Sequence, residues 1–223
     1  MRMKKLLLIL AGTVALATIP ADARSHKRRP ATSKNAPGQF DYYLLTLSWA
    51  PDFCDSHPQQ MNSRECGRGN HVGFIVHGLW PQFEAGGYPK QCAPAQPVAT
   101  DIVTRMLPLM MDAGLVQHEW RDHGTCSGLD AGAYFDSVRQ AFSQIKVPND
   151  LKNLSAPLSI SPGELDAKFV AANPGLSSSV HTECSGDEVS EVRICFSKDL
   201  KPRSCGADVQ DCSAGKLRML PPR

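Results

Sequence analysis

The sequence predicts an α+β domain with a central antiparallel β-sheet, packed helices and stabilising disulfides. Short apolar, β-branched runs typical of strands are interspersed with segments of helical spacing, without the regular alternation that indicates a parallel sheet. The 223 residues are 42% hydrophobic and 21% charged, an ordinary globular composition that favours one domain, expected over 39–223. Eight cysteines, an even number, indicate disulfides formed in an oxidising compartment.

The first 23 residues are expected to be a secretory signal peptide. Met1–Lys5 is positively charged, Leu6–Ile19 is apolar, and Ala21–Ala23 offers small residues for cleavage after Ala23. The apolar run is shorter than the roughly 20 residues of a membrane-spanning helix. We therefore expect an exported protein, periplasmic or secreted, that has no membrane anchor.

Residues 24–38 are expected to be a flexible, basic lead-in, for which contact with nucleic acid or the cell envelope is the less favoured alternative. The whole chain has a net charge of +2, but without residues 1–23 it holds 21 basic and 21 acidic residues. Global charge therefore gives no argument for a polyanionic partner.

Two central strands are predicted in the first half of the chain. Phe40–Trp49 is aromatic and apolar and stops before Pro51, and the polar segment Cys54–Cys66 should form a loop. Val72–Trp80 is β-branched and ends at Pro81, which predicts a second buried strand.

Helices should follow in the middle of the chain. The Gly- and Pro-rich segment 83–99 is expected to be a loop. Val98–Gly114 has helical spacing, with Pro108 as a kink or break and Gly114 as the stop. A short helix over His118–Cys126 and another over Ala133–Ile145 come next.

The last third combines one helix with a hairpin. Ser161 and Glu164 form the pattern of a capping box, which opens a helix to about Ala172. Residues 180–183 and 188–196 predict two strands of a hairpin that turns at 185–187. The remaining segment, 201–223, is polar and carries two of the cysteines.

Two short segments concentrate reactive side chains. Phe74–Gln82 (FIVHGLWPQ) and His118–Cys126 (HEWRDHGTC) together hold three of the seven histidines, two of the three tryptophans and a glutamate. A single histidine in an apolar strand, such as His77, is more often a satisfied core residue than a catalyst. The combination of imidazoles, a carboxylate and indoles instead favours a site for proton transfer beside a stackable group.

Metal-based hydrolysis is a poor match to these residues. A zinc hydrolase motif places two histidines four positions apart, whereas His118 and His123 are five apart. The cysteines also lack the close Cys-x-x-Cys pairs of zinc sites. We expect neither a metal nor another cofactor.

Two histidines and a carboxylate suit RNA cleavage, because the 2′-hydroxyl of RNA is a built-in nucleophile. One neutral imidazole can take its proton while an imidazolium protonates the departing 5′-oxygen, which leaves a 2′,3′-cyclic phosphate. The two segments, with the strand Phe40–Pro51 (FDYYLLTLSWAP), resemble the ribonuclease T2 family over roughly residues 40–212.

This resemblance implies a monomeric endoribonuclease of low base specificity whose substrate is single-stranded RNA. It also implies a role for each site residue. The catalysts are His77 and His123 for acid and base and Glu119 as carboxylate; His118 binds phosphate; Trp80, Tyr88 and Gln82 bind a base. It also implies the disulfides Cys54–Cys66, Cys92–Cys126, Cys184–Cys212 and Cys195–Cys205.

Two positions depart from the family pattern. Many members have a phosphate-stabilising lysine where this chain has Asp122, which should raise the pKa of His123, and Arg121 should point away on the helix. The activity should therefore be weakened, or a cation should come from elsewhere. Ser48 replaces a base-contacting glutamine of some plant members. The alternative is an RNA-binding protein on the same scaffold with impaired catalysis.

Overall fold

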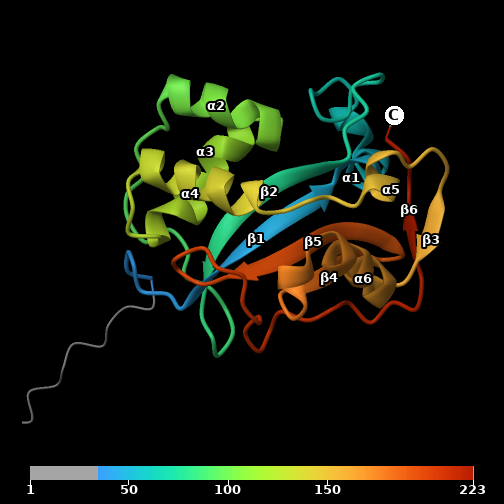
Figure 1. Ribbon diagram of the computed structural model, residues 1–223. Helices are drawn as coiled ribbons and strands as arrows, with labels where there is room; N and C mark the ends of the chain where they lie inside the picture. The colour runs from blue at the N-terminus through green and yellow to red at the C-terminus, as the bar shows by residue number, and fades with distance from the viewer. Residues whose placement is uncertain (1–34, 223) are drawn as a thin grey trace, which may run out of the picture. The chain divides into compact units, whose positions relative to one another are not determined.

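A six-stranded sheet forms the centre of the part of the chain that the computed structural model describes, residues 35–222 (Figure 1). The predicted signal peptide and most of the basic lead-in lie outside the described residues. The strands are β1 (Tyr42–Trp49), β2 (Phe74–Gln82), β3 (Leu158–Ile160), β4 (Val180–Ser185), β5 (Glu188–Phe196) and β6 (Leu217–Met219).

The strand order is β2-β1-β5-β6-β3, and β4 also pairs with β5. Every pair is antiparallel except β5 with β6, so the sheet is mixed at one contact. The predicted α+β class is confirmed. The parallel contact was not predicted, because it joins β5 to a three-residue strand in the polar tail.

The helices of the described residues are α1 (Ala50–Ser56), α2 (Thr100–Met110), α3 (Ala113–Asp122), α4 (Ala131–Ser143), α5 (Asn149–Lys152) and α6 (Pro162–Ala172), with 3₁₀ turns η1 (Pro58–Gln60), η2 (Gly124–Cys126) and η3 (Pro174–Leu176). Helices α2, α3 and α4 group beside β2, whereas α6 packs along β4 (Figure 1). Edge strand β2 therefore borders the helical group that carries the second predicted segment.

Strand β1 is buried on both faces, which explains its nearly continuous apolar run. Leu45, Leu47 and Trp49 lie in the main core, which also holds the buried side chains of the helices. Tyr42 and Leu44 point to the opposite face and pack in a smaller cluster with Cys195 and Trp80. The two central strands are confirmed with ends shifted by two residues at most.

The predicted stop at Gly114 is wrong. Helix α2 ends earlier, at Met110; its C-cap Met111 has a left-handed φ of 61°, and Pro108 lies inside the helix. Asp112 then caps α3 by accepting a hydrogen bond from the Leu115 backbone at 2.7 Å, so Gly114 is in the first turn of α3. The capping box of Ser161 on α6 and the β4–β5 hairpin are confirmed.

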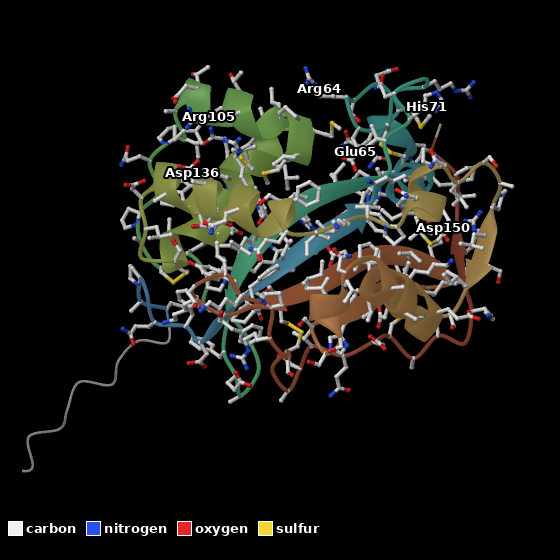
Figure 2. The ribbon with its side chains drawn as sticks, in the orientation of Figure 1. Arg64, Glu65, His71, Arg105, Asp136 and Asp150 are labelled. Atoms are coloured by element: carbon white, nitrogen blue, oxygen red, sulfur yellow. A yellow bond between two sulfur atoms is a disulfide. The ribbon has the colours of Figure 1, made fainter. Side chains whose placement is uncertain are left out.

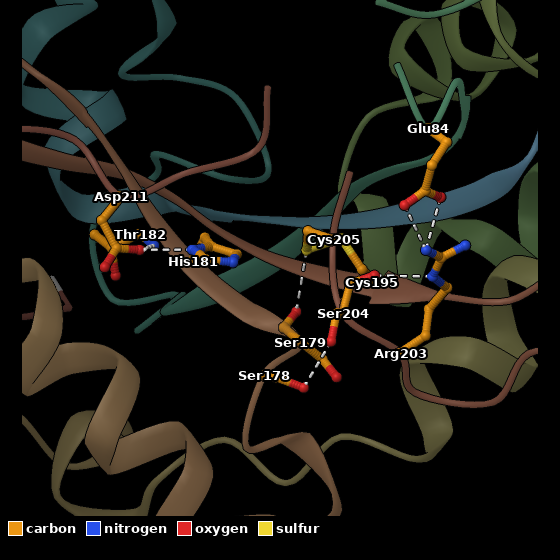
Figure 3. Close-up of a disulfide and its surroundings, with 10 residues drawn as sticks. All are labelled: Glu84, Ser178, Ser179, His181, Thr182, Cys195, Arg203, Ser204, Cys205 and Asp211. Atoms are coloured by element: carbon orange, nitrogen blue, oxygen red, sulfur yellow. Dashed lines mark hydrogen bonds and ion pairs between the residues drawn. A yellow bond between two sulfur atoms is a disulfide. The ribbon is translucent and has the colours of Figure 1, made fainter. Parts of the chain in front are cut away.

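The four disulfides join the pairs that the family resemblance implies. The pair Cys195–Cys205 ties β5 to the C-terminal segment, close to the contact between Glu84 and Arg203 (Figure 3). No helix in the described range 35–222 is both long and apolar enough to cross a membrane.

Candidate active site

His77 lies at a β-bulge in β2. In the register with β1, Thr46 pairs with Gly78 and Leu47 pairs with Val76, so His77 has no partner residue. A bulge re-aims a side chain relative to the regular alternation of a strand, and bulges are frequent next to active sites. The ring of His77 is accordingly partly exposed, although it is flanked by buried neighbours.

Glu119 of α3 meets this strand above Gly78. A Cβ atom placed on Gly78 would overlap both the Glu119 carboxylate and the indole Nε1 of Trp80. The absence of a side chain lets Trp80 Nε1 donate a 2.7 Å hydrogen bond to Glu119 Oε2. The other oxygen, Oε1, lies 3.7 Å from His77 Nε2 and has no hydrogen-bond partner in the described residues.

His123 follows α3 and completes a cluster around one indole. Its backbone N–H donates to Glu119 O at 3.0 Å, which extends the helical turn. The ring of His123 stacks on Trp80 at 5.1 Å between centroids and 25° between planes, and the ring of His77 meets the same indole edge-on at 5.1 Å. Tyr88, from the loop after β2, lies 5.7 Å from His123.

Several bonds fasten the loop after β2 to α3 and η2. The disulfide Cys92–Cys126 is one of them. Gln91 N donates to Asp122 O at 2.9 Å, and Cys92 N donates to Thr125 Oγ1 at 3.2 Å. These bonds hold the loop that carries Tyr88 against the segment that carries His123.

The pKa of His77 is raised. Burial lowers it, but the hydrogen bond to Glu191 and the negative charges of Glu119, Glu191 and Glu65 outweigh burial. Glu191 lies on β5, and its Oε1 is 2.7 Å from His77 Nδ1. Sequence reasoning missed Glu191, since its only signal is a charged residue inside an apolar strand.

The pKa of His123 is lowered to about 4. Burial is the largest cause, and the positive charges of His118, His77 and Lys90 add to it. Asp122 acts in the raising direction, as expected, but it does not outweigh burial. The prediction that the pKa of His123 is raised is therefore wrong, because the ring is enclosed rather than solvated.

Asp122 is buried and surrounded by donors. Burial would raise the pKa of its carboxyl, but hydrogen bonds from Lys90, Gln91 and Arg121 hold that pKa well below its ordinary value. Lys90 Nζ lies 3.1 Å from Asp122 Oδ2, and Arg121 Nε lies 2.7 Å from Oδ1. The expectation that Arg121 points away is wrong, because its side chain folds back onto Asp122.

His118 and Glu119 border these cations. Arg121 Nη2 is 2.7 Å from His118 Nδ1, and His118 Nε2 is 4.0 Å from Glu119 Oε1. Burial lowers the pKa of His118. Burial also raises the pKa of Glu119 to about 7, against the charge of His77. A share of Glu119 is therefore a neutral carboxylic acid near neutral pH, able to donate a hydrogen bond.

A cavity of about 240 Å³ opens beside His77, away from Tyr88. Ser48 of β1, Leu115 of α3 and Glu65 contribute to its wall. Glu65 comes from the loop between η1 and β2 (Figure 2). Burial raises the pKa of Glu65 to about 7. This hollow is large enough for a planar ring.

Gln82 ends β2 and its side chain is buried, at 3% exposed. Trp80 and Tyr88, the other two predicted base contacts, lie against His123. The role of Gln82 as a base contact stays a prediction.

Within residues 35–222, one group of side chains has the spacing of metal ligands. Asp166 of α6, His181 of β4 and Asp211 place one ligand atom each within 4.8 Å of the others. His181 Nδ1 lies 2.9 Å from Asp211 Oδ1 (Figure 3). None of the three belongs to β2 or α3, so this group is separate from the histidine cluster.

Comparison with known sequences identifies a family and several relatives. The sequence profile described as the ribonuclease T2 family matches residues 40–205. A probable ribonuclease of Haemophilus influenzae is 29% identical over 192 residues, covering 80% of this chain and 65% of that protein. A ribonuclease of Aeromonas hydrophila is 39% identical over 97 residues, covering 44% and 42%. The chain thus spans less than two thirds of these relatives.

Solved structures share the fold. An RNase-related protein from Calystegia sepium has a TM-score of 0.62 at 23% identity, covering 81% of this chain and 97% of that one. The crystal structure of RNase NT in complex with 5′-AMP has a TM-score of 0.54 at 22% identity, covering 77% and 98%. At these identities the likeness concerns the fold.

Proposed function

Because the chain belongs to the ribonuclease T2 family, we propose that it is a metal-independent endoribonuclease that cleaves single-stranded RNA. The observation that carries the proposal is the pair of histidines on one indole with opposite pKa shifts. Near neutral pH, the raised pKa of His77 favours its charged form, and the pKa of His123 at about 4 keeps that ring neutral. A base and an acid are thus both present at one site.

In the proposed first step, neutral His123 takes the proton of the 2′-hydroxyl, and the 2′-oxygen attacks phosphorus. The bond from phosphorus to the 5′-oxygen breaks, and His77 gives that oxygen its proton. The products are a 2′,3′-cyclic phosphate and a free 5′-hydroxyl. Water then opens the ring, with the two histidines in exchanged roles, to leave a 3′-phosphate.

The reacting phosphate is proposed to lie over Glu119 and His118. The neutral form of Glu119 can donate to a phosphate oxygen instead of repelling it, and Oε1 has no competing partner in the described residues. The cations Lys90 and Arg121 stand beside His118. They supply the positive charge that a lysine at position 122 would give and Asp122 cannot. Of the two expectations for Asp122, a cation from another position is therefore favoured over weakened activity.

The bases are proposed to flank the phosphate. The base 5′ of the cut stacks against Trp80 and Tyr88 next to His123, and stacking is worth roughly 1–3 kcal/mol per base with little regard to identity. The nucleotide 3′ of the cut enters the cavity beside His77, where Ser48 replaces a longer amide side chain. Low base specificity follows from stacking.

The four disulfides support action in an oxidising compartment, the periplasm or the medium. We propose that the chain acts there as a monomer on RNA.

The test is to incubate the purified protein with single-stranded RNA in excess chelator and to analyse the ends of the products. We expect cleavage with 2′,3′-cyclic phosphate and 5′-hydroxyl ends, and little cleavage by the variant His77→Ala/His123→Ala. Binding without cleavage would support the alternative of an RNA-binding protein. Cleavage that stops in chelator would contradict the metal-independent mechanism.

A further inference from the structure

His77 is held from a strand that is not its neighbour. The order β2-β1-β5 places β1 between His77 and Glu191, yet His77 Nδ1 and Glu191 Oε1 are 2.7 Å apart. Adjacent strands are about 4.8 Å apart, so this bond bridges roughly 10 Å of sheet. The bulge leaves His77 without a partner residue on β1. Ser48 of β1 pairs with Glu191 in the register and lines the same cavity as His77 and Glu191.

Glu191 is itself fixed from the other side. Arg193 donates to Glu191 Oε2 from Nε at 3.0 Å, and its Nη2 lies 2.9 Å from the same oxygen. Arg193 Nη1 also donates to Glu183 Oε2 at 2.8 Å. Glu183 pairs with Glu191 across β4 and β5, where two carboxylates would repel each other without the arginine.

This network leaves one oxygen of Glu191 for His77. Glu191 is only 6% exposed, so water offers little competition for the bond. An ionised carboxylate accepts hydrogen bonds and cannot donate them, and therefore Nδ1 of His77 must carry a proton. The opposite ring nitrogen, Nε2, faces Glu119 and the cluster.

Resting on the proposed function, we infer that Glu191 is a positioning residue, oriented by Arg193, that fixes the tautomer and direction of His77 through both steps of the reaction. Charged His77 gives the Nε2 proton to the departing oxygen, while the other proton stays on Nδ1 and remains hydrogen-bonded to Glu191 Oε1. The neutral ring then presents the Nε2 lone pair to water in the second step.

The charged groups that face His77 come from several elements. They are Glu191 on β5, Glu119 on α3, Glu65 in the loop between η1 and β2, and the neighbouring imidazoles His118 and His123. Of these, Glu191 makes the hydrogen bond to Nδ1. Its removal should therefore change the alkaline limb of the rate profile, which reports His77, and spare the acid limb, which reports His123.

The experiment compares pH profiles of kcat/KM for wild type, Glu191→Gln and Glu191→Ala on a dinucleoside phosphate. Glu191→Gln keeps the shape but loses the charge, so the alkaline limb should move to lower pH while the acid limb stays. Glu191→Ala should lower kcat by a further 10- to 100-fold, about the effect of removing the hydrogen-bond partner of a metal-bound histidine, with little change in KM.

The pair His181 and Asp211 provides a matched control. It joins a histidine Nδ1 to a carboxylate at 2.9 Å on β4, outside the cluster (Figure 3). Asp211→Asn should leave the profile unchanged. An alkaline limb in Glu191→Gln that coincides with wild type would overturn the inference.

A titration by ¹⁵N NMR of wild-type protein tests the same point without a substitution. Neutral His77 should carry its proton on Nδ1, and a proton on Nε2 would refute the role of Glu191 even if the variants fail to fold. Full activity in His77→Ala would instead remove the proposed function. Loss of activity in His77→Ala with unaltered Glu191 variants would remove only this inference.

Discussion

At the scale of single residues, Asp122 serves as a buried anchor for cations. Its carboxylate contacts Lys90 from the loop after β2 and Arg121 from its own helix. Arg121 Nη2 lies 2.7 Å from His118 Nδ1, where the phosphate is proposed to bind, and the charge of Lys90 also acts on His118. In the sequence, Asp122 looks incompatible with phosphate binding. In the fold, its carboxylate holds the two cations beside the proposed phosphate position.

Lys90→Gln tests this reading. Loss of a charge-assisted contact to phosphate is worth roughly 1.5–3 kcal/mol, so kcat/KM should fall about 10-fold or more. Lys168→Gln, which removes an exposed lysine paired with Asp150, is the control and should change nothing. Equal rates for Lys90→Gln and wild type would show that Lys90 does not contact the substrate.

The site requires a residue without a side chain at Gly78. In Gly78→Ala the new methyl group displaces the Glu119 carboxylate and the Trp80 indole. A displacement near 1 Å costs on the order of 10²-fold, which is the expected loss in kcat. Gly163→Ala on α6, where an added Cβ meets nothing within 4 Å, should keep full activity. If circular dichroism shows that Gly78→Ala is folded and the variant keeps full activity, the described packing is contradicted.

At the scale of elements, the site is divided between an edge strand and a helix. Strand β2 carries His77 and Trp80, and α3 with its following residue carries Glu119 and His123. The disulfide Cys92–Cys126 fastens the loop after β2 to the end of α3. Its removal should therefore affect the alignment of the two halves as well as stability.

The control for this bond is Cys184–Cys212, which closes a segment of similar length, 28 against 34 residues, and whose sulfur atoms join β4 to the C-terminal segment, not to α3 or the loop after β2. Removal of either pair by alanine should cost roughly 2–5 kcal/mol of stability, measured by denaturant unfolding. At a temperature where both variants are folded, only Cys92→Ala/Cys126→Ala should lose activity. Equal activity in the two variants would refute a positioning role for the bond.

Local patterns predicted the elements well and the long-range contacts poorly. The apolar run of β1, the capping box of Ser161 and the β4–β5 hairpin depend on neighbouring residues, so the sequence was sufficient for them. The contacts of Glu191 with His77 and of Lys90 with Asp122 depend on strand order and loop path. Strands β3 and β6 are three residues long, too short for a recognisable period.

At the scale of the whole molecule, buried carboxyl groups link stability to pH. Burial raises the pKa of four of them to about 7: Asp52, Glu65, Glu119 and Asp166. In the unfolded chain these groups lose their protons near their ordinary values of 3.8 and 4.5. The folded state therefore holds extra protons between about pH 4 and 7, and its stability falls as pH rises through this window.

Carboxyl groups with a lowered pKa affect stability at the acid end of the pH range. Asp122 and Glu191 stabilise the folded state above their unfolded values, and this contribution is lost as pH falls below about 4. Stability should thus peak in mildly acidic solution, with a higher melting temperature at pH 5 than at pH 8. Glu119→Gln should reduce that difference. A higher melting temperature at pH 8 would contradict the burial described for these groups.

In the proposed mechanism the two histidines divide the proton transfers, with His123 as base and His77 as acid. The most direct measurement uses an RNA dinucleotide whose 5′-bridging oxygen is replaced by sulfur, because a thiolate leaves without a proton. On normal RNA, His77→Ala and His123→Ala should each lose roughly 10²–10⁴-fold. On the sulfur substrate, His77→Ala should approach the wild-type rate while His123→Ala stays slow. Rescue of His123→Ala, or of neither variant, would contradict the account.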